Sequence, residues 1–357
     1  MNILYTLSGF GFGHATRSRV VIKLLEKAGH SVKIATYGQS LAYFQKYLSS
    51  DIIEIAGLKS SLSGNEISKG KMFLDFLKKL PALAGKNLPL FRKIIKNFKI
   101  DVIFNDFEPT ARWVARTMNV PLITIDNQFL SQLCKIEVSS QFTKDFAAFN
   151  SLISLFFPWG DWRFVLSFAP EFTPLKKHLA HNTFIIPPIL REEIFEIKPQ
   201  KKDFILVYQT APVYKKELFQ TLPKIKEKFI CYNLGEPQIF KNMVLKGFSE
   251  KGILTDISRA KAVILNGGFT VMSEALYLKK PVFSLPFKGD FEQILNGLVV
   301  KKSGYGDFSQ DFDENALRNF LNNLGSFEKK LENYHQARNS IFEKKLRRVL
   351  RKIEFGE

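Results

Sequence analysis

The sequence predicts an α/β protein built from two doubly wound parallel sheets. Short apolar, β-branched runs alternate with segments of helical length in both halves of the chain, which is the pattern of βαβ units. A chain of 357 residues corresponds to about two domains, and a hydrophobic content of 45% is ample for two buried cores. Since no motif recurs at a period of about 20 to 50 residues, solenoids and propellers are excluded.

The first half of the chain contains the first predicted sheet. The segment RSRVVIKLLEKAGH, residues 17–30, carries apolar residues at helical spacing and ends near Gly29, a helix-ending residue. It separates the first two of the predicted strands, which are residues 2–7, 31–36, 52–55, 101–105 and 121–125.

The second half repeats this alternation after a segment rich in proline and charge, PPILREEIFEIKPQKKD, which we interpret as a linker. Its predicted strands are residues 204–208, 229–232, 262–265 and 282–285. Beyond Asn315 the pattern is almost entirely helical. We therefore expect an N-terminal domain at residues 1–190, a C-terminal domain at 191–330, and a basic helix at 331–357 that could pack back on the first domain.

The chain carries a formal net charge of +18, so its surface attracts anions, although charge alone does not say which ones. Basic residues concentrate at 69–99 and again at 329–352. The first stretch mixes Lys and Arg with Phe, Leu and Ile and holds one acid, Asp75. This mixture suits an anionic membrane interface. An ordinary pair of amphipathic helices covering the sheet is the alternative.

Several features indicate a cytoplasmic protein. No apolar run approaches the roughly 20 residues of a membrane-spanning helix, and the N-terminus enters a strand pattern at once. Contact through residues 69–99 would place the protein peripherally at the inner face of the membrane. Cys134 and Cys231 lie in no Cys-x-x-Cys or Cys/His cluster, so we interpret both as reduced packing residues.

The first candidate site motif is SGFGFGHATRS, residues 8–18, which follows the first strand and begins the first helix. Glycines let the backbone turn tightly, and a helix N-terminus offers N–H groups to an anion, so Gly11, Gly13 and Arg17 are candidates for an acceptor or phosphate loop. The spacing differs from a dinucleotide fingerprint, because the third glycine is replaced and no acidic residue ends the second strand. We therefore expect no nicotinamide or flavin cofactor.

His14 lies at the junction of this loop and the helix. Imidazole suits the removal of a proton from a sugar hydroxyl near neutral pH, and an adjacent carboxylate would fix its tautomer. Asp106 ends the strand DVIFN on the same rim of the sheet and is the predicted partner, with a plain cap of helix 108–117 as the alternative. Glu108 and Asp126 are the other candidates for the partner of His14. Glu108 is more simply interpreted as a first-turn helix acid, and Asp126 as a strand-end residue on the acceptor side.

The second motif, residues 265–297, is more specific. Gly267 and Gly268 form a turn after a strand, and a helix begins at about Thr270. The exposed N–H groups at the start of this helix suit a diphosphate without a metal. Glu274 lies one helical turn later, where a carboxylate can accept both hydroxyls of a ribose. Side-chain amides and carboxylates then follow that suit hexose hydroxyls: Asp290, Glu292, Gln293 and Asn296.

This segment resembles the donor-binding signature of the GT-B glycosyltransferases, especially family 28 and its relatives. The shared pattern is a glycine pair, a small hydroxyl residue, a helix Glu, then a strand, proline and D-x-x-Q-x-x-N. It is matched at Gly267, Gly268, Thr270, Glu274, Pro281, Pro286, Asp290, Gln293 and Asn296. The resemblance implies two Rossmann-like domains facing each other across a cleft. The specific motifs cover about fifty residues.

By this resemblance, the glycine pair and Thr270 would hold the diphosphate of a nucleotide-sugar, most simply a UDP-sugar, and Glu274 the ribose. Glu292, Gln293 and Asn296 would contact the transferred hexose, although Glu292 stands where the muramyl-lipid enzyme has an amide. No Asp-x-Asp metal motif occurs, so catalysis is expected to be metal-independent. His14 would deprotonate the acceptor hydroxyl, which belongs to a lipid or lipid-linked molecule if residues 69–99 contact a membrane.

Two alternatives remain at this point. A nucleotide-sugar 2-epimerase would share the architecture and donor pocket, and would release its product without an acceptor. A nucleic-acid-binding protein is favoured only by charge. Because the Lys-rich segments contain no recognised binding module, we expect no nucleic-acid partner.

Overall fold

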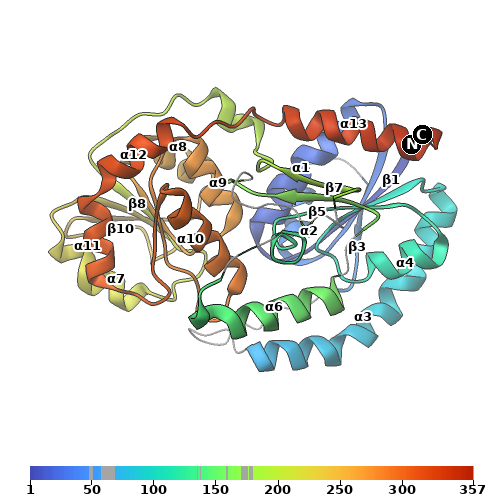
Figure 1. The fold of residues 1–357 in the computed structure, drawn as a ribbon, viewed down its shortest axis with the longest axis horizontal. Coiled ribbons are helices and arrows are strands. Elements are labelled where there is room, and N and C mark those ends of the chain that lie inside the picture. The colour runs from blue at the N-terminus through green and yellow to red at the C-terminus, as the bar shows by residue number, and fades with distance from the viewer. Residues whose placement is uncertain are drawn as a thin grey trace. The chain divides into compact units, whose positions relative to one another are not determined.

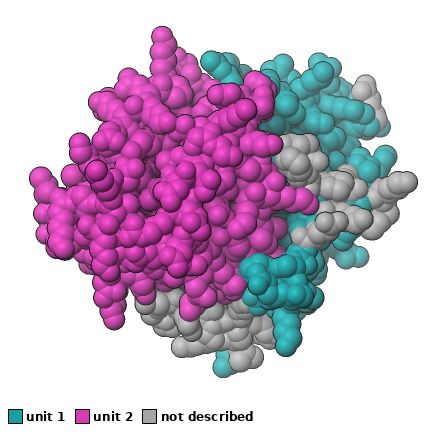
Figure 2. Space-filling view, turned by 60° about the vertical axis from the view of Figure 1, so that its left-hand side comes forward, with its two compact units in different colours: residues 1–61, 68–191, 337–357 teal, residues 62–67, 192–336 magenta. Residues whose placement is uncertain are grey.

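The structure is a computed structural model that describes residues 1–47, 51–57, 69–134, 136, 138–157, 160–169, 176 and 180–356, without the side chains of 69–77. Its described residues form two compact units (Figure 2). The first unit draws on 1–61, 68–191 and 337–357, and the second on 192–336. The chain thus passes from the first unit to the second after residue 191 and returns after residue 336.

The first unit contains a fully parallel sheet, in which seven strands lie within the described residues. From β1 the chain adds strands to one side, then moves to β4 and adds strands to the other side. Ligands of open α/β sheets bind at the carboxyl ends of strands where the order reverses, which here is the β1/β4 boundary. The spatial order is β3 (Ile52–Glu54), β2 (Ser31–Thr36), β1 (Asn2–Leu7), β4 (Val102–Asp106), β5 (Leu122–Asp126), β6 (Trp162–Leu166), β7 (Thr183–Ile186).

The helices of the first unit cover this sheet (Figure 1). They are α1 (Gly11–Lys27), α2 (Gly38–Tyr47), α3 (Lys69–Phe98), α4 (Ala111–Met118), α5 (Leu130–Leu133), α6 (Thr143–Phe156) and α13 (Ser340–Phe355). In the described part of α3, apolar side chains at helical spacing pack with Leu4, Ile103 and Val114 in one buried core. The residues of α3 in that core are Phe91, Ile94 and Ile95.

The exposed face of α3 is basic, with Lys78, Lys86, Arg92 and Lys96 in contact with solvent. Segment 69–99 is therefore one long helix over the sheet, with its apolar face directed to the core. The sequence analysis gave a pair of amphipathic helices covering the sheet as the alternative to a membrane contact. The structure has one helix in that covering position. The side chains of 69–77 lie outside the described residues, so their part of the membrane prediction is not addressed by the structure.

The second unit contains another sheet, with seven strands among the described residues and only the β10–β11 pair antiparallel. Its strand order reverses between β8 and β12, which places a second expected ligand position at the carboxyl end of β12. The spatial order is β10 (Gln238–Phe240), β11 (Met243–Lys246), β9 (Phe229–Tyr232), β8 (Ile205–Tyr208), β12 (Val263–Leu265), β13 (Val282–Ser284), β14 (Gly306–Phe308).

The helices of the second unit follow its strands in sequence. They are α7 (Lys215–Thr221), α8 (Glu250–Arg259), α9 (Phe269–Tyr277), α10 (Phe291–Ser303), α11 (Glu314–Asn322) and α12 (Leu324–Glu332). The core of this unit contains Ile205, Phe229, Ile264 and Phe283, one from each of four neighbouring strands, together with Phe320 from α11. The predicted α/β class with two parallel-dominated sheets is confirmed.

All nine predicted strands are present, each within one residue of its expected bounds at either end. Five others were not predicted: β6, β7, β10, β11 and β14. The three-residue β14 contains Gly306 and Asp307, residue types that are depleted in strands, so its pattern carried no signal. Cys134 and Cys231 are both free and buried, as predicted. None of the helices among the described residues combines the length and apolarity needed to cross a bilayer.

Candidate active site

The predicted His14–Asp106 pair forms at the switch point of the first sheet. β1 and β4 are neighbours, with Leu7 opposite Asp106 in the register, so α1 begins beside the end of β4. His14 Nδ1 lies 2.6 Å from Asp106 Oδ1. Arg17 Nη2 also lies 2.9 Å from this nitrogen. In the tautomer with the proton on Nδ1, Nδ1–H donates to Asp106, and Nε2 keeps a lone pair for the proton of an incoming hydroxyl. The His14 side chain is 14% exposed and Asp106 is fully buried.

Arg17 and Ser18, also from α1, hold the same carboxylate. Arg17 donates from Nη2 to Asp106 Oδ1 at 2.5 Å and from Nε to Oδ2 at 2.6 Å, and Ser18 Oγ donates to Oδ2 at 3.0 Å. Burial by itself would raise the pKa of Asp106, but the positive charge of Arg17 and the hydrogen bonds from Arg17 and His14 hold this pKa well below its usual range. Asp106 is therefore an ionised acceptor with a fixed orientation.

Arg17 differs from its expected place in an acceptor or phosphate loop. Its side chain is buried, and its guanidinium also donates to Asn127 Oδ1 at 2.9 Å and to Asp126 Oδ1 at 3.2 Å. These contacts direct it into the protein, so Arg17 orients Asp106 and is not a ligand for a departing diphosphate. The Gly11 amide is likewise used internally, since it donates to Gln39 Oε1 at 2.8 Å. Gly13 lies in the first turn of α1 and is half-buried.

The turn after β4 contains a residue that the sequence analysis did not identify. Phe107 has φ +62°, a left-handed conformation that costs a bulky residue free energy and is concentrated at functional sites. Asn105 maintains this turn, because its side chain accepts from the Glu108 amide and donates to the Glu108 carbonyl. The Phe107 ring lies parallel to the His14 imidazole, with centroids 6.0 Å apart. Phe107 thus forms one wall beside the imidazole.

Glu108 lies two residues before the N-cap of α4 and not in its first turn as predicted, and it accepts hydrogen bonds from the start of that helix. Its Oε2 accepts from the amides of Thr110 and Ala111, at 2.9 and 2.6 Å, and its Oε1 accepts from the Thr110 hydroxyl at 2.7 Å. With Glu108 in this role, Asp106 is free to serve His14 and does not cap the helix. Asp126 lies in the same buried network through Arg17, so it adds negative charge next to the pair.

The burial of Glu108 predicts a pH dependence of stability. Desolvation raises its pKa to about 7 from an ordinary value of 4.5, against the opposing effect of its hydrogen bonds. Because the folded pKa is the higher one, the folded state binds more protons between these values. The free energy of unfolding should therefore fall by up to about 3 kcal/mol as pH rises through that window. Urea unfolding at pH 5 and pH 8 measures this fall. It should be much smaller in Glu108→Gln, and an equal fall in both proteins would contradict the assignment.

The glycine turn of the second motif lies at the switch point of the second sheet, directly after β12. Gly267 has φ +92°, and a Cβ there would lie 2.9 Å from both the Gln293 carbonyl oxygen and the Ser284 Oγ. Only glycine can occupy this position without movement of β13 and α10. Gly268 differs, because it precedes α9 with φ −63° and a Cβ there would meet no atom within 4 Å. The space that a side chain at Gly268 would occupy is therefore empty, and Gly268 itself is half-buried.

The D-x-x-Q-x-x-N residues connect the loops around this turn. Asp290 caps α10 by accepting from the Gln293 amide at 3.2 Å, and Gln293 Oε1 accepts from the Phe287 amide at 3.0 Å. Asn296 is 4% exposed and donates to the Gly267 carbonyl at 3.0 Å. The sequence assigned these side chains to the transferred sugar. The structure instead uses the Asp290 carboxylate and the Asn296 amide to hold the loops after β12 and β13 in place.

The other predicted donor residues lie on or next to this turn. Thr270 and Glu292 are half-buried in the first turns of α9 and α10. Glu274 is on α9, one turn after Thr270, and its side chain is 0% exposed. The structure thus places Gly268 and Thr270, both half-buried, where α9 begins, and Glu274 is buried one turn later.

Asn266 is a further residue that the sequence analysis missed. It is buried, and its side chain donates to Gln209 Oε1 and to the Leu285 carbonyl and accepts from the Thr210 amide. It therefore fixes the carboxyl ends of β8, β12 and β13 relative to one another. Its position just before the glycine pair was the available signal, because an amide there can reach the adjacent strands. Among the described residues, no group of three or more His, Cys, Asp or Glu is arranged to hold a metal ion.

Two Rossmann-like units, each with a glycine-led helix at its switch point, define the GT-B fold. Solved structures of this fold align over nearly the whole chain. A UDP-glucosyltransferase of Polygonum tinctorium that glucosylates indoxyl aligns with a TM-score of 0.70 at 12% identity, covering 99% of this chain and 98% of its own. A glycosyltransferase of Phytolacca americana, solved with UDP-2-fluoro-glucose and pterostilbene, gives a TM-score of 0.70 at 13% identity, with coverage of 99% and 100%.

The family model described as glycosyl transferase family 1 matches residues 1–325, and the chain belongs to this family. A glycosyltransferase of Methanosarcina mazei is 27% identical over 329 residues, covering 86% of this chain and 85% of the relative. A second, from Methanosarcina acetivorans, is 27% identical over 343 residues with the same coverage of both chains. The predicted GT-B glycosyltransferase is confirmed, although the matching family model is described as family 1, where the motifs resembled family 28.

Proposed function

We propose that this glycosyltransferase transfers a hexose from a UDP-sugar to an acceptor hydroxyl without a metal ion. The observation that carries the donor assignment is the empty space beside Gly268 where α9 begins, at the switch point of the second sheet. The likeness to a glycosyltransferase solved with UDP-2-fluoro-glucose supports the choice of uridine and of a hexose.

In this proposal the diphosphate binds against Gly268 and the first turn of α9. The N–H groups at the N-terminus of α9 and the positive end of the helix dipole would stabilise the two phosphates, and the Thr270 hydroxyl would add a donor. As the sugar departs, the same groups stabilise the developing negative charge, which is the task a metal performs elsewhere. Glu274, which is buried, would have to turn toward the ligand to accept from the ribose hydroxyls. Gln293 and Glu292 would contact the hexose, with Asp290 and Asn296 as positioning residues.

His14 is the proposed general base. Its Nε2 removes the proton of the acceptor hydroxyl while the oxygen attacks the anomeric carbon, so the C–O bond to the sugar forms as the bond to the diphosphate breaks. Asp106 stabilises the imidazolium that results, and the proton remains on Nε2 until product leaves. Arg17 and Ser18 act through Asp106 by holding both carboxylate oxygens.

The acceptor is proposed to be a lipid or lipid-linked molecule reached at the inner, cytoplasmic face of an anionic membrane. The exposed cations of α3 support a contact with anionic lipid through residues 69–99. The burial of its apolar residues in the core weakens the case for insertion, since the apolar face is not free to enter a bilayer.

Donor binding can be tested before the acceptor is known. UDP should raise the melting temperature in a concentration-dependent way, because a ligand that binds only the folded state stabilises it by RT ln(1 + [L]/Kd), about 2.7 kcal/mol at a hundredfold excess over Kd. Differential scanning fluorimetry with UDP, ADP, GDP and an oligonucleotide measures the effect. Stabilisation by the oligonucleotide with none by any nucleoside diphosphate would contradict the proposal.

A further inference from the structure

Helix α13 packs one face against the first unit. Its buried side chains are Phe342, Leu346, Val349 and Leu350. The Phe342 ring meets Phe164 of β6 edge-on at 5.2 Å, and Lys345 Nζ lies 5.0 Å from the centre of the Phe184 ring of β7. The helix is therefore anchored over the β6–β7 edge of the sheet, with a defined face directed away from it.

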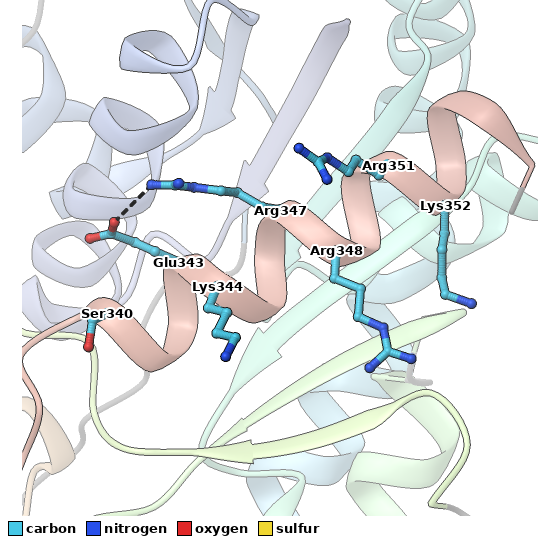
Figure 3. Close-up of a pocket in the computed structure, with 7 residues that line it drawn as sticks. All are labelled: Ser340, Glu343, Lys344, Arg347, Arg348, Arg351 and Lys352. Atoms are coloured by element: carbon cyan, nitrogen blue, oxygen red, sulfur yellow. Dashed lines mark ion pairs between the residues drawn. The ribbon is translucent and has the colours of Figure 1, made fainter.

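The outward face of α13, defined by Lys344, Arg347, Arg348, Arg351 and Lys352, is strongly basic. These side chains line a hollow of about 550 Å³. Figure 3 shows Arg347 and Arg351 leaving the helix on one side and Lys344, Arg348 and Lys352 on the other. Glu343 is the only acid lining the hollow, and it pairs with Arg347 at 3.5 Å. The Arg347 side chain is nevertheless 76% exposed. The face thus presents five cations against one carboxylate.

Exposed apolar side chains bound this basic face at both ends. Ile341 and Phe355 are 37% and 67% exposed. Positions 341, 344, 348, 352 and 355 follow one another at intervals of three or four residues, so they share one face of the helix. Apolar residues flanking a row of cations on one helix face are typical of helices that lie in a membrane interface.

We propose that α13 lies flat on an anionic bilayer. Lys344, Arg348 and Lys352 would contact lipid phosphates, while Ile341 and Phe355 enter the boundary between headgroups and acyl chains. With 16 residues at about 1.5 Å each, the helix offers a row roughly 24 Å long, enough to meet several headgroups. Each cation near an anionic surface strengthens binding by about fivefold. Two apolar anchors combined with electrostatic attraction suit reversible, peripheral binding.

This surface is distinct from the basic face of α3. Leu122 of β5 packs in the core formed with α3, whereas Phe164 of β6, which contacts α13, is paired with Ile125 of β5. Leu122 and Ile125 are three residues apart in a strand, so they point to opposite faces of the sheet. Helices α3 and α13 therefore cover opposite faces of the first sheet (Figure 1). One flat bilayer cannot engage both, so the contact proposed here through α13 replaces the contact through residues 69–99.

Vesicle binding tests the proposal without any sugar donor, so its failure would leave the transferase proposal intact. The full-length protein should bind vesicles of equal parts phosphatidylglycerol and phosphatidylcholine, and not pure phosphatidylcholine. Lys344→Gln with Arg348→Gln should lower the partition coefficient by about 25-fold, the product of two fivefold losses. The matched control is Arg92→Gln with Lys96→Gln on α3, which removes one Arg and one Lys four residues apart and should change binding by less than about twofold.

A second variant separates a bilayer from a soluble polyanion. Ile341→Ser with Phe355→Ser keeps every charge, so it should weaken vesicle binding while leaving any binding of a duplex oligonucleotide unchanged. Melting temperatures should stay at the wild-type value in all variants, because the altered side chains are exposed. The proposal is overturned if anionic vesicles are not bound, if the α3 pair loses as much binding as the α13 pair, or if loss of both apolar anchors has no effect.

Discussion

Replacing His14 with alanine should lower the rate of the first turnover by about 10² to 10⁴, the range for loss of a positioned general base. Nε2 is the atom that takes the hydroxyl proton, and no other imidazole of the described residues contacts Asp106. Rapid-quench measurement of UDP released from the UDP-sugar gives this rate, with water as acceptor if no better one is found. A loss below about tenfold would be too small for general base catalysis.

The control for this variant is donor binding, because His14 belongs to the first unit and the proposed donor turn to the second. The melting shift produced by UDP should be the same in His14→Ala and wild type. Asp106→Asn should also lose most of the rate, since the neutral amide no longer stabilises the imidazolium. A variant that lost UDP stabilisation together with the rate would indicate a misfolded protein or a wrong assignment.

The two glycines of the donor turn should respond to alanine in opposite ways. Gly267→Ala should lower the free energy of unfolding by about 2 to 4 kcal/mol, because it combines backbone strain with close approach to a backbone carbonyl. Gly268→Ala should fold as stably as wild type, since its Cβ meets nothing. That same Cβ would occupy the space of the diphosphate, so UDP should bind at least about tenfold more weakly, a loss of about 1.4 kcal/mol.

Urea unfolding and isothermal titration with UDP measure the two effects separately. The adjacent positions carry the same chemical change, so each serves as the control of the other. Unchanged UDP affinity in Gly268→Ala would place the diphosphate elsewhere. Unchanged stability in Gly267→Ala would mean that β13 and α10 move apart at little cost, contrary to the contacts of Ser284 and Gln293.

Much of the fold followed from the sequence because hydrophobic periodicity is a local property. The runs at 2–7, 31–36 and 229–232 were predicted with their exact observed bounds, since each is a short run rich in apolar residues beside a turn or helix signal. The β6 and β7 strands were missed. Their pairing with β5 and with each other depends on contacts between residues distant in the chain, and intrinsic strand preference is strongly context-dependent.

The candidate site was predictable where residue type and strand order sufficed. His14 and Asp106 follow neighbouring strands, so their proximity came from topology. Arg17, Asn296 and Asp290 were assigned to ligands because their types suit phosphates and sugars. Their contacts lie within the protein, and only the three-dimensional distances reveal which buried groups need partners. The left-handed conformation of Phe107 had no signal in the sequence, since aromatic residues rarely adopt it.

The central claim is that a nucleoside diphosphate binds the backbone where α9 begins. Hydrogen–deuterium exchange with and without UDP tests it directly, because a bound diphosphate accepts hydrogen bonds from the amides in question. The account predicts slowed exchange in peptides spanning residues 266–274, with little change over the basic faces of α3 and α13. Protection confined to those basic helices, or no protection at 266–274 at a UDP concentration that raises the melting temperature, would contradict it.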